Sequence, residues 1–198
     1  MVNIHQLIED FMNTETPVKG VYNEISLQLE LGIYLREHLP KDSYWVQFER
    51  NITSYTESNT DAFVKKEMDI VVEDTKAKEK YAIELKFPVN GQYPEQMKAF
   101  LKDIRFMEQV LGVDGFVGAS VLTLVEDKLF YTPAKVTGFP YDVFRAEANP
   151  QREIRVPKDC YIGIENTYKG VWKPITDSKG QINRMYYHIP INGNKNNF

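Results

Sequence analysis

The sequence predicts one layered α/β domain of 198 residues. Two long segments, residues 23–39 and 94–111, repeat apolar residues at helical spacing. Residues 68–72, 81–87 and 115–124 are short apolar segments bounded by turn residues, which is typical of strands. The last of these segments is apolar on both faces, as expected for a strand in the middle of a layered α/β domain. A chain of this length is long enough to bury a core of its own.

The N-terminal part is predicted to be helical. Asn3 is an expected N-cap with Gln6 three residues later, and the apolar residues that follow recur at helical spacing. The second helix, residues 23–39, ends before Pro40. Glu24 lies in its first turn, on the same face as the predicted core stripe. That stripe consists of Leu27, Leu31, Tyr34, Leu35 and His38.

The next expected element is a strand at residues 44–49, followed by a loop at residues 50–66 that is rich in Ser, Thr and Asn. Loops of this length are often functional. Beyond the core at residues 22–124, residues 125–198 are predicted to form a β-rich C-terminal extension of the same domain. Its segments of strand composition are residues 129–131, 161–164, 170–172 and 185–189.

The composition is that of an ordinary folded protein, with 42% hydrophobic and 26% charged residues. The net charge of −4 counts against a broad, non-specific grip on nucleic acid, which needs a basic surface. No apolar run approaches the length of a membrane span, so no membrane partner is expected. The first residues lack the pattern of a signal peptide, which favours a cytoplasmic protein. The single cysteine, Cys160, excludes an internal disulfide and a cysteine zinc cluster.

Polar residues interrupt two of the predicted strands. Asp69 lies in residues 68–72, and Glu84 and Lys86 share one face of residues 81–87, because side chains alternate along a strand. The short turn between these strands would bring Asp69 beside Glu84. Two neighbouring carboxylates repel each other unless a positive charge lies between them, and oxygen ligands suit Mg²⁺. A lysine beside such an ion can stabilise charge on a reacting phosphate.

A structural explanation of the same residues stays open. A glutamate and a lysine on one face are also common on an ordinary half-solvated strand. Asp69 changes the balance, because it interrupts an apolar strand where an unpaired carboxylate would be costly. The three residues together therefore favour metal-dependent cleavage of phosphodiester bonds.

The order of these elements resembles the core of the PD-(D/E)XK nuclease superfamily, the restriction-endonuclease-like fold, over residues 22–124. The resemblance implies a mixed central sheet flanked by helices, with an acidic residue on the second core strand and a (D/E)-x-K motif on the third. Asp69, Glu84 and Lys86 match these positions. The chain departs from the pattern at Met68, where many members have a proline.

Two further residues match positions that are often functional in this superfamily. Glu24 corresponds to a glutamate of the first helix, and Gln96 to a glutamine of the helix after the motif. For Glu24, a carboxylate that merely stabilises the helix N-terminus is an equal alternative. For Gln96, an ordinary polar residue of a first helical turn is the favoured alternative.

The resemblance also implies roles. Asp69 and Glu84 would bind one or two Mg²⁺ ions, for which Mn²⁺ can substitute, with the backbone carbonyl of Leu85 as a further ligand. Lys86 would orient the attacking water or stabilise the developing charge. Glu24 would hold an outer metal-bound water, and Gln96 would position the lysine or the phosphate.

The expected protein is thus a Mg²⁺-dependent nuclease whose substrate is DNA, with RNA left open. The candidates for basic contacts to the substrate are Lys65, Lys66, Lys86 and Lys98. One alternative is a nuclease-fold protein that no longer cleaves and serves as a binding or regulatory module. Another is an α/β protein that binds a small molecule or nucleotide, for which the sequence has no glycine-rich loop. A homodimer is compatible with the sequence.

Overall fold

The computed structural model describes residues 2–89, 91–145, 153–158, 160 and 162–193. The helices are α1 (Ile4–Met12), α2 (Thr16–Lys19), α3 (Glu24–His38), α4 (Tyr93–Val110) and α5 (Tyr141–Phe144), with 3₁₀ turns η1 (Ile52–Ser54) and η2 (Lys128–Phe130). The strands are β1 (Tyr44–Asn51), β2 (Glu67–Asp74), β3 (Glu79–Lys86), β4 (Phe116–Val125), β5 (Glu153–Val156), β6 (Tyr168–Val171), β7 (Lys173–Thr176) and β8 (Ile182–Asn192).

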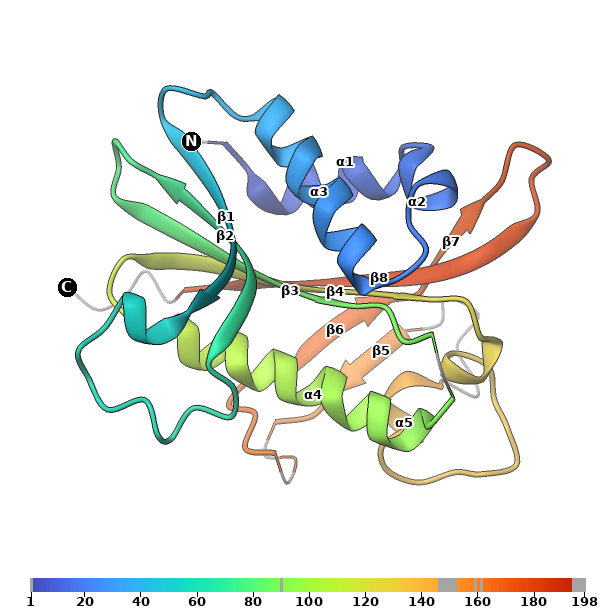
Figure 1. Cartoon of the computed structure of the whole chain (residues 1–198). Helices are drawn as coiled ribbons and strands as arrows, with labels where there is room; N and C mark the ends of the chain where they lie inside the picture. The colour runs from blue at the N-terminus through green and yellow to red at the C-terminus, as the bar shows by residue number, and fades with distance from the viewer. Residues whose placement is uncertain (1, 90, 146–152, 159, 161, 194–198) are drawn as a thin grey trace.

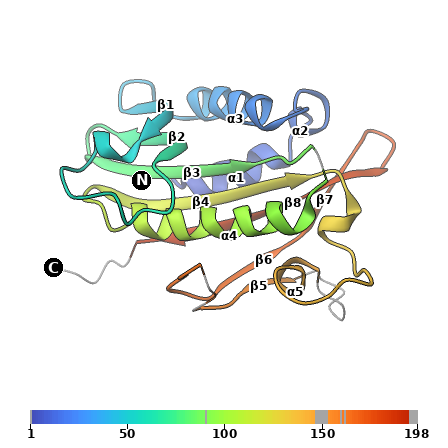
Figure 2. The same cartoon turned by 60° about the horizontal axis from the view of Figure 1, so that its bottom comes forward.

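Six strands form one mixed sheet in the order β1-β2-β3-β4-β8-β7. Strands β3 and β4 are parallel, and the other neighbours are antiparallel. Helix α4 makes the crossover that two parallel strands require. Helices α1 and α3 cover one face of the sheet, whereas α4 and the pair β5–β6 lie on the other (Figures 1 and 2). The expected α/β class, with a mixed central sheet flanked by helices, is confirmed.

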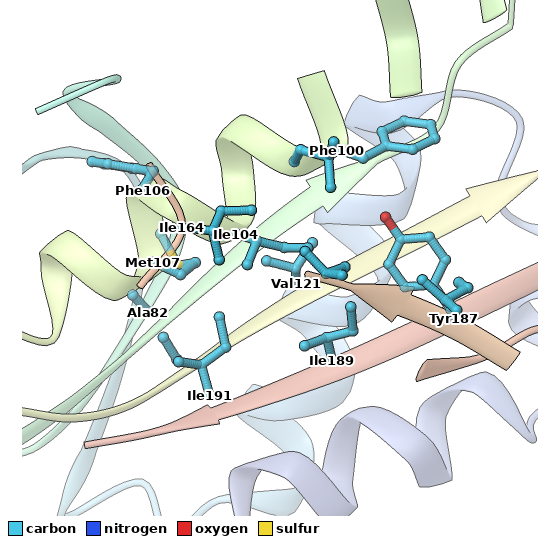
Figure 3. Packing of buried hydrophobic residues seen from close by; sticks show 14 of the residues in the cluster. Ala82, Phe100, Ile104, Phe106, Met107, Val121, Ile164, Tyr187, Ile189 and Ile191 are labelled. Atoms are coloured by element: carbon cyan, nitrogen blue, oxygen red, sulfur yellow. The ribbon is translucent and has the colours of Figure 1, made fainter. Parts of the chain in front are cut away.

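Each face of the sheet has its own hydrophobic cluster. Leu27 and Leu31 of α3 are fully buried against Ile70, Ile83 and Leu85. On the opposite face, the buried residues of α4 pack on β4 and β8 (Figure 3). Members of this second cluster include Val71, Ala82, Phe100, Leu101, Ile104, Val121 and Ile189. Burial of each large apolar side chain stabilises the fold by roughly 1.5–3 kcal/mol, so the two clusters fix the β2 and β3 strands in place.

The C-terminal part differs in detail from the sequence prediction. It is β-rich, as expected, but β8 pairs with β4, so that β8 and β7 extend the central sheet. The prediction of a strand at residues 129–131 was wrong. The Asp127 side chain accepts a hydrogen bond from the Leu129 amide, and this bond starts the turn η2. Residues 162–164 are not a strand, and residue 161 lies outside the described residues.

The prediction is also wrong for one residue of the core stripe of α3. His38 is exposed and stacks on Tyr34, with ring centroids 3.9 Å apart. His38 is the last residue of α3. At this end of the helix, the face that is buried at Leu27, Leu31 and Leu35 is open to solvent. Within the described residues, no helix is long and apolar enough to cross a membrane.

A polar network fixes α1 to the sheet. Glu9 of α1 contacts His188 Nδ1 at 3.1 Å and Lys173 Nζ at 2.7 Å. The other ring nitrogen of His188 lies 2.9 Å from Ser120 Oγ of β4, which His5 Nδ1 approaches to 2.8 Å. Burial alone would raise the pKa of Glu9, but the hydrogen bonds from His188 and Lys173 lower it to about 2. The network therefore stabilises the docking of α1 while Glu9 is ionised.

Candidate functional site

Asp69 lies where the pairing of β2 with β3 ends. The register runs from Asp74 opposite Glu79 to Ile70 opposite Ile83. At the next position, Asp69 Oδ2 accepts a hydrogen bond of 2.6 Å from the Leu85 amide. The Asp69 carboxylate thus accepts a hydrogen bond from an amide that lies beyond the last backbone pairing of β2 with β3. Burial raises the pKa of Asp69 above its ordinary value, against the opposing influence of nearby lysines and of the Leu85 amide.

Glu84 is the most buried of the charged residues predicted for the site, with no exposed surface. It lies two residues after Ala82 on β3, and so points to the face that α4 covers. Its Oε1 is in direct ion-pair contact with Lys65 Nζ and lies 3.7 Å from Lys86 Nζ. Its Oε2 accepts no hydrogen bond from any described residue. A buried carboxylate oxygen without a donor is costly, and such groups are uncommon in folded proteins.

Lys86 is surrounded by oxygen atoms. Its Nζ donates to the Leu85 carbonyl at 2.9 Å and to Glu24 Oε1 at 3.2 Å. Asp103 Oδ2 lies 3.8 Å from the same nitrogen. Burial by itself would lower the pKa of Lys86, but the carboxylates of Asp103, Glu24 and Asp69 outweigh it and raise the pKa above the ordinary value. Lys86 is therefore a cation at every pH near neutrality.

Glu24 connects the start of α3 to the end of β3. Besides its contact with Lys86, its Oε2 accepts a hydrogen bond of 3.0 Å from the Phe87 amide. The predicted inward position of Glu24 brings it to the lysine of the motif, although its side chain keeps some exposure to solvent. Its contacts serve both to close the strand end and to fix the ammonium group of Lys86.

Asp103 of α4 belongs to the same cluster and was missed in the sequence. Its side chain is almost completely buried, with Oδ1 3.8 Å from Lys65 Nζ and Oδ2 3.8 Å from Lys86 Nζ. Burial raises the pKa of Asp103 well above its ordinary value, and the two lysines only partly oppose this. The signal was present in the sequence, because Asp103 falls between Phe100 and Met107 on the buried stripe of α4.

Not every predicted residue joins this cluster. Gln96 lies in the first turn of α4, and in the described part of the chain no hydrogen bond connects its side chain to the cluster. Of the four lysine candidates, Lys65 and Lys86 are in the cluster. Lys66 instead lies 3.4 Å from Asp61, and none of the described ion pairs connects Lys98 to the cluster.

The cluster contains the kind of ligand atoms that bind a hard divalent cation, but it also contains two ammonium groups. All side-chain atoms that could bind an ion are carboxylate oxygens, the ligands that Mg²⁺ and Mn²⁺ prefer. Within the described residues, Glu84 Oε2 and Asp103 Oδ2 are buried and accept no hydrogen bond. Among the described residues, no three Asp, Glu, His or Cys side chains are already arranged as a metal cage. An ion bound at Glu84 Oε1 would have to displace Lys65. The residues therefore fit such an ion in chemistry, provided that Lys65 moves.

Comparisons with protein-family models, with curated proteins and with solved structures gave no match to this chain.

Proposed function

We propose that this protein is a divalent-metal-dependent nuclease that hydrolyses phosphodiester bonds in DNA, with a core of the PD-(D/E)XK type. The observation that carries the proposal is the fully buried Glu84, which has an oxygen without a hydrogen-bond donor in the described residues. Its two lysine neighbours, Lys65 and Lys86, also act on Asp69 and Asp103. An apolar side chain at the position of Glu84 would pack in this core without the desolvation penalty of a charge. The penalty is understandable if the carboxylate has a chemical role.

The residues divide into those that would hold the ion and those that act on the substrate. Asp69, Glu84 and the Leu85 carbonyl would hold Mg²⁺ or Mn²⁺, and the bound ion would polarise the phosphate and supply an acidic water molecule. Lys86 acts as a fixed positive charge beside the reacting phosphate, because its raised pKa rules out a role as a neutral base near pH 7. Glu24 fixes the position of Lys86 through its 3.2 Å contact. Gln96, at the start of α4, is assigned to the substrate side.

The net charge of the whole chain limits how it would bind DNA. With a net charge of −4, binding cannot depend on a broad basic surface. The contacts must be local, and Lys65 is the best placed of the lysine candidates. It lies at the end of the loop that precedes β2, within contact distance of Glu84. When released from Glu84, its ammonium group is free to contact a phosphate.

A second function is favoured by one specific observation. Lys65 already neutralises Glu84 through a direct ion pair. A protein that has lost catalysis and kept the fold for binding or regulation would tolerate this closed arrangement. The two functions differ in whether the cluster binds a divalent ion.

The test is cleavage of supercoiled plasmid, linear duplex DNA and single-stranded RNA by the purified protein with Mg²⁺ or Mn²⁺. Cleavage that requires the metal, stops with EDTA and is lost in Glu84→Gln supports a nuclease. Lys76→Met is the matched control, because Lys76 lies in the turn after β2, pairs with Asp42 and is not a candidate for substrate contact, so this variant should cleave at the wild-type rate. A folded wild-type protein that cleaves none of the substrates with either metal would refute the nuclease and favour the binding module.

A further inference from the structure

Lys65 reaches the candidate site from a loop that is attached to α4. Residues 61–66 have no regular secondary structure, and in both views this loop lies beside the C-terminal half of α4 (Figures 1 and 2). The side-chain amide of Gln109, at the end of α4, binds the loop at two points. Its Oε1 accepts a hydrogen bond of 2.9 Å from the Val64 amide, and its Nε2 donates to the Ala62 carbonyl at 2.8 Å. One glutamine side chain thus pairs with the loop backbone as a neighbouring strand would.

An aromatic contact lies between these two hydrogen bonds. The ring of Phe63 meets the fully buried ring of Phe106 edge to face, with centroids 6.4 Å apart and an interplanar angle of 76°. Lys65 Nζ lies 6.0 Å from the centre of the same Phe106 ring and 3.8 Å from Asp103 Oδ1. Asp103, Phe106 and Gln109 follow one another at intervals of three residues, so neighbouring side chains of α4 make all of these contacts.

The position of the Lys65 ammonium group therefore depends on how the loop is attached. The loop attachment brings this group into direct ion-pair contact with Glu84 Oε1, one of the oxygens that the proposed function assigns to the divalent ion. The ammonium group and the ion are both positive, so they compete for this oxygen. Attachment of the loop to α4 and binding of the ion at Glu84 are thus alternative states of the same site.

We propose that residues 62–65 form an autoinhibitory latch. While the latch is closed on α4, Lys65 occupies Glu84, and a divalent ion binds there only when the latch opens. This inference rests on the function proposed above and adds the regulation of the same site. By linkage, the ion must shift the latch toward its open state by the same factor by which closure of the latch weakens ion binding.

The latch has the character of a contact that opens. It consists of two hydrogen bonds between uncharged groups and one aromatic contact, and water can replace both hydrogen bonds when the latch opens. Val64 is 43% exposed, and the side chain of Lys65 is 32% exposed. Segments with few buried contacts and exposed backbone hydrogen bonds are those that open locally while the rest of a protein stays folded. The buried clusters on both faces of the sheet can therefore stay intact when the latch opens.

The test is calorimetric titration of the full chain with Mn²⁺ in a double-mutant cycle. Gln109→Met removes both hydrogen bonds and keeps a long, unbranched side chain. We expect this variant to bind Mn²⁺ about 3- to 10-fold more tightly than the wild type, because the net contribution of each such bond is small. In Lys65→Met, the closed latch no longer brings a cation to Glu84. Adding Gln109→Met to Lys65→Met should therefore change the affinity less than about twofold.

Hydrogen exchange of the peptide that spans residues 60–66 reports on the latch itself. Saturating Mn²⁺ should speed exchange in the wild type, because the Val64 amide loses its bond to Gln109. The same ion should leave exchange unchanged in Lys65→Met. Gln6→Met is the matched control, because it removes the 2.8 Å bond of another helical glutamine, to Asp10 on α1, and it should bind Mn²⁺ like the wild type.

The possible failures separate the latch from the metal site. The melting temperature checks the fold of each variant, and Phe63→Leu, which removes the aromatic contact, replaces Gln109→Met if that variant unfolds. Unchanged Mn²⁺ affinity in the folded latch variant, or an equal gain in the Lys65→Met background, would overturn the latch and leave the metal site in place. No Mn²⁺ binding by any of these proteins would overturn the metal site and the latch together.

Discussion

Lys65 forms an ion pair with the buried Glu84, so its removal is the most direct perturbation of the candidate site. In Lys65→Met, the apolar part of the side chain is nearly preserved and the ammonium group is lost. A divalent ion then reaches Glu84 without displacing a cation, and we expect tighter Mn²⁺ binding than in the wild type. Lys66→Met removes the same charge one residue further along the chain, at a lysine that contacts Asp61.

The size of the effect follows from the ion pair. At a typical contact distance of about 2.8 Å and an effective dielectric constant of about 20, the Coulomb attraction between Lys65 and Glu84 is roughly 6 kcal/mol. The net cost of releasing Lys65 is much smaller, because its ammonium regains hydration and its side chain is already 32% exposed. A net cost of about 1–2 kcal/mol corresponds to about 5- to 30-fold tighter binding of Mn²⁺ by Lys65→Met.

Stability should change in the opposite direction. Without metal, Lys65→Met leaves Glu84 buried with Lys86 at 3.7 Å as its only described ion-pair partner, and we expect a lower melting temperature. Saturating Mn²⁺ should raise the melting temperature more in Lys65→Met than in the wild type. Calorimetric titration with Mn²⁺ and thermal unfolding with and without Mn²⁺ measure both effects.

Two results would refute this reasoning in different ways. Equal Mn²⁺ affinity in Lys65→Met and Lys66→Met would mean that Lys65 does not compete with the ion, and that any gain comes only from the change in net charge. No Mn²⁺ binding in the wild type or in either variant would instead refute the metal site itself.

Two further predictions concern catalysis and acid stability. Lys86→Ala should lower the cleavage rate by about 10²–10³ while Mn²⁺ affinity is kept or increased, because the lysine and the ion repel each other; a rate loss that merely follows a fall in melting temperature would show that Lys86 is structural. Glu9→Gln should flatten the acid side of the stability profile. The folded pKa of Glu9 is about 2 against an ordinary 4.5, so its contribution is complete above about pH 4.5 and is lost as pH falls toward about 2. At pH 7 the expected cost is about 2 kcal/mol, less than the full shift implies because Lys173 is partly exposed, and urea unfolding of both proteins at pH 7 and pH 3 measures it.

The fold could be predicted where the signal is local. The stripes of α3 and α4 and the apolar strands follow from periodicity, and a tight turn between β2 and β3 leaves little freedom of register. That register brings Asp69 to the amide of Leu85, beside Glu84. The position of β8 beside β4 could not be predicted in the same way. Its pairing joins residues some 70 positions apart, and strand composition does not specify a partner.

The candidate site was predicted in part for the same reason. Asp69, Glu84 and Lys86 lie on neighbouring strands, whose geometry is regular. Lys65 precedes β2, at the end of an irregular segment whose path is set by tertiary contacts such as that of Gln109 with the Ala62 carbonyl. Asp103 requires knowledge of which face of α4 meets the cluster. A carboxylate on an otherwise apolar helical stripe was a usable signal for Asp103, and this residue belongs to the candidate site.

The charge of the cluster favours cation binding over a purely structural role. Four carboxylates, those of Glu24, Asp69, Glu84 and Asp103, face two ammonium groups, so the fully ionised cluster has a net charge of 2 − 4 = −2. A salt-bridge network that served only stability would gain from balanced charges, because each unpaired buried charge is costly. Burial is the main cause of the raised pKa values of Asp69 and Asp103, and neighbouring carboxylates add to it. Binding of a proton is one way to reduce the negative charge of the cluster. A divalent ion would be another, because its two positive charges would balance the fully ionised cluster.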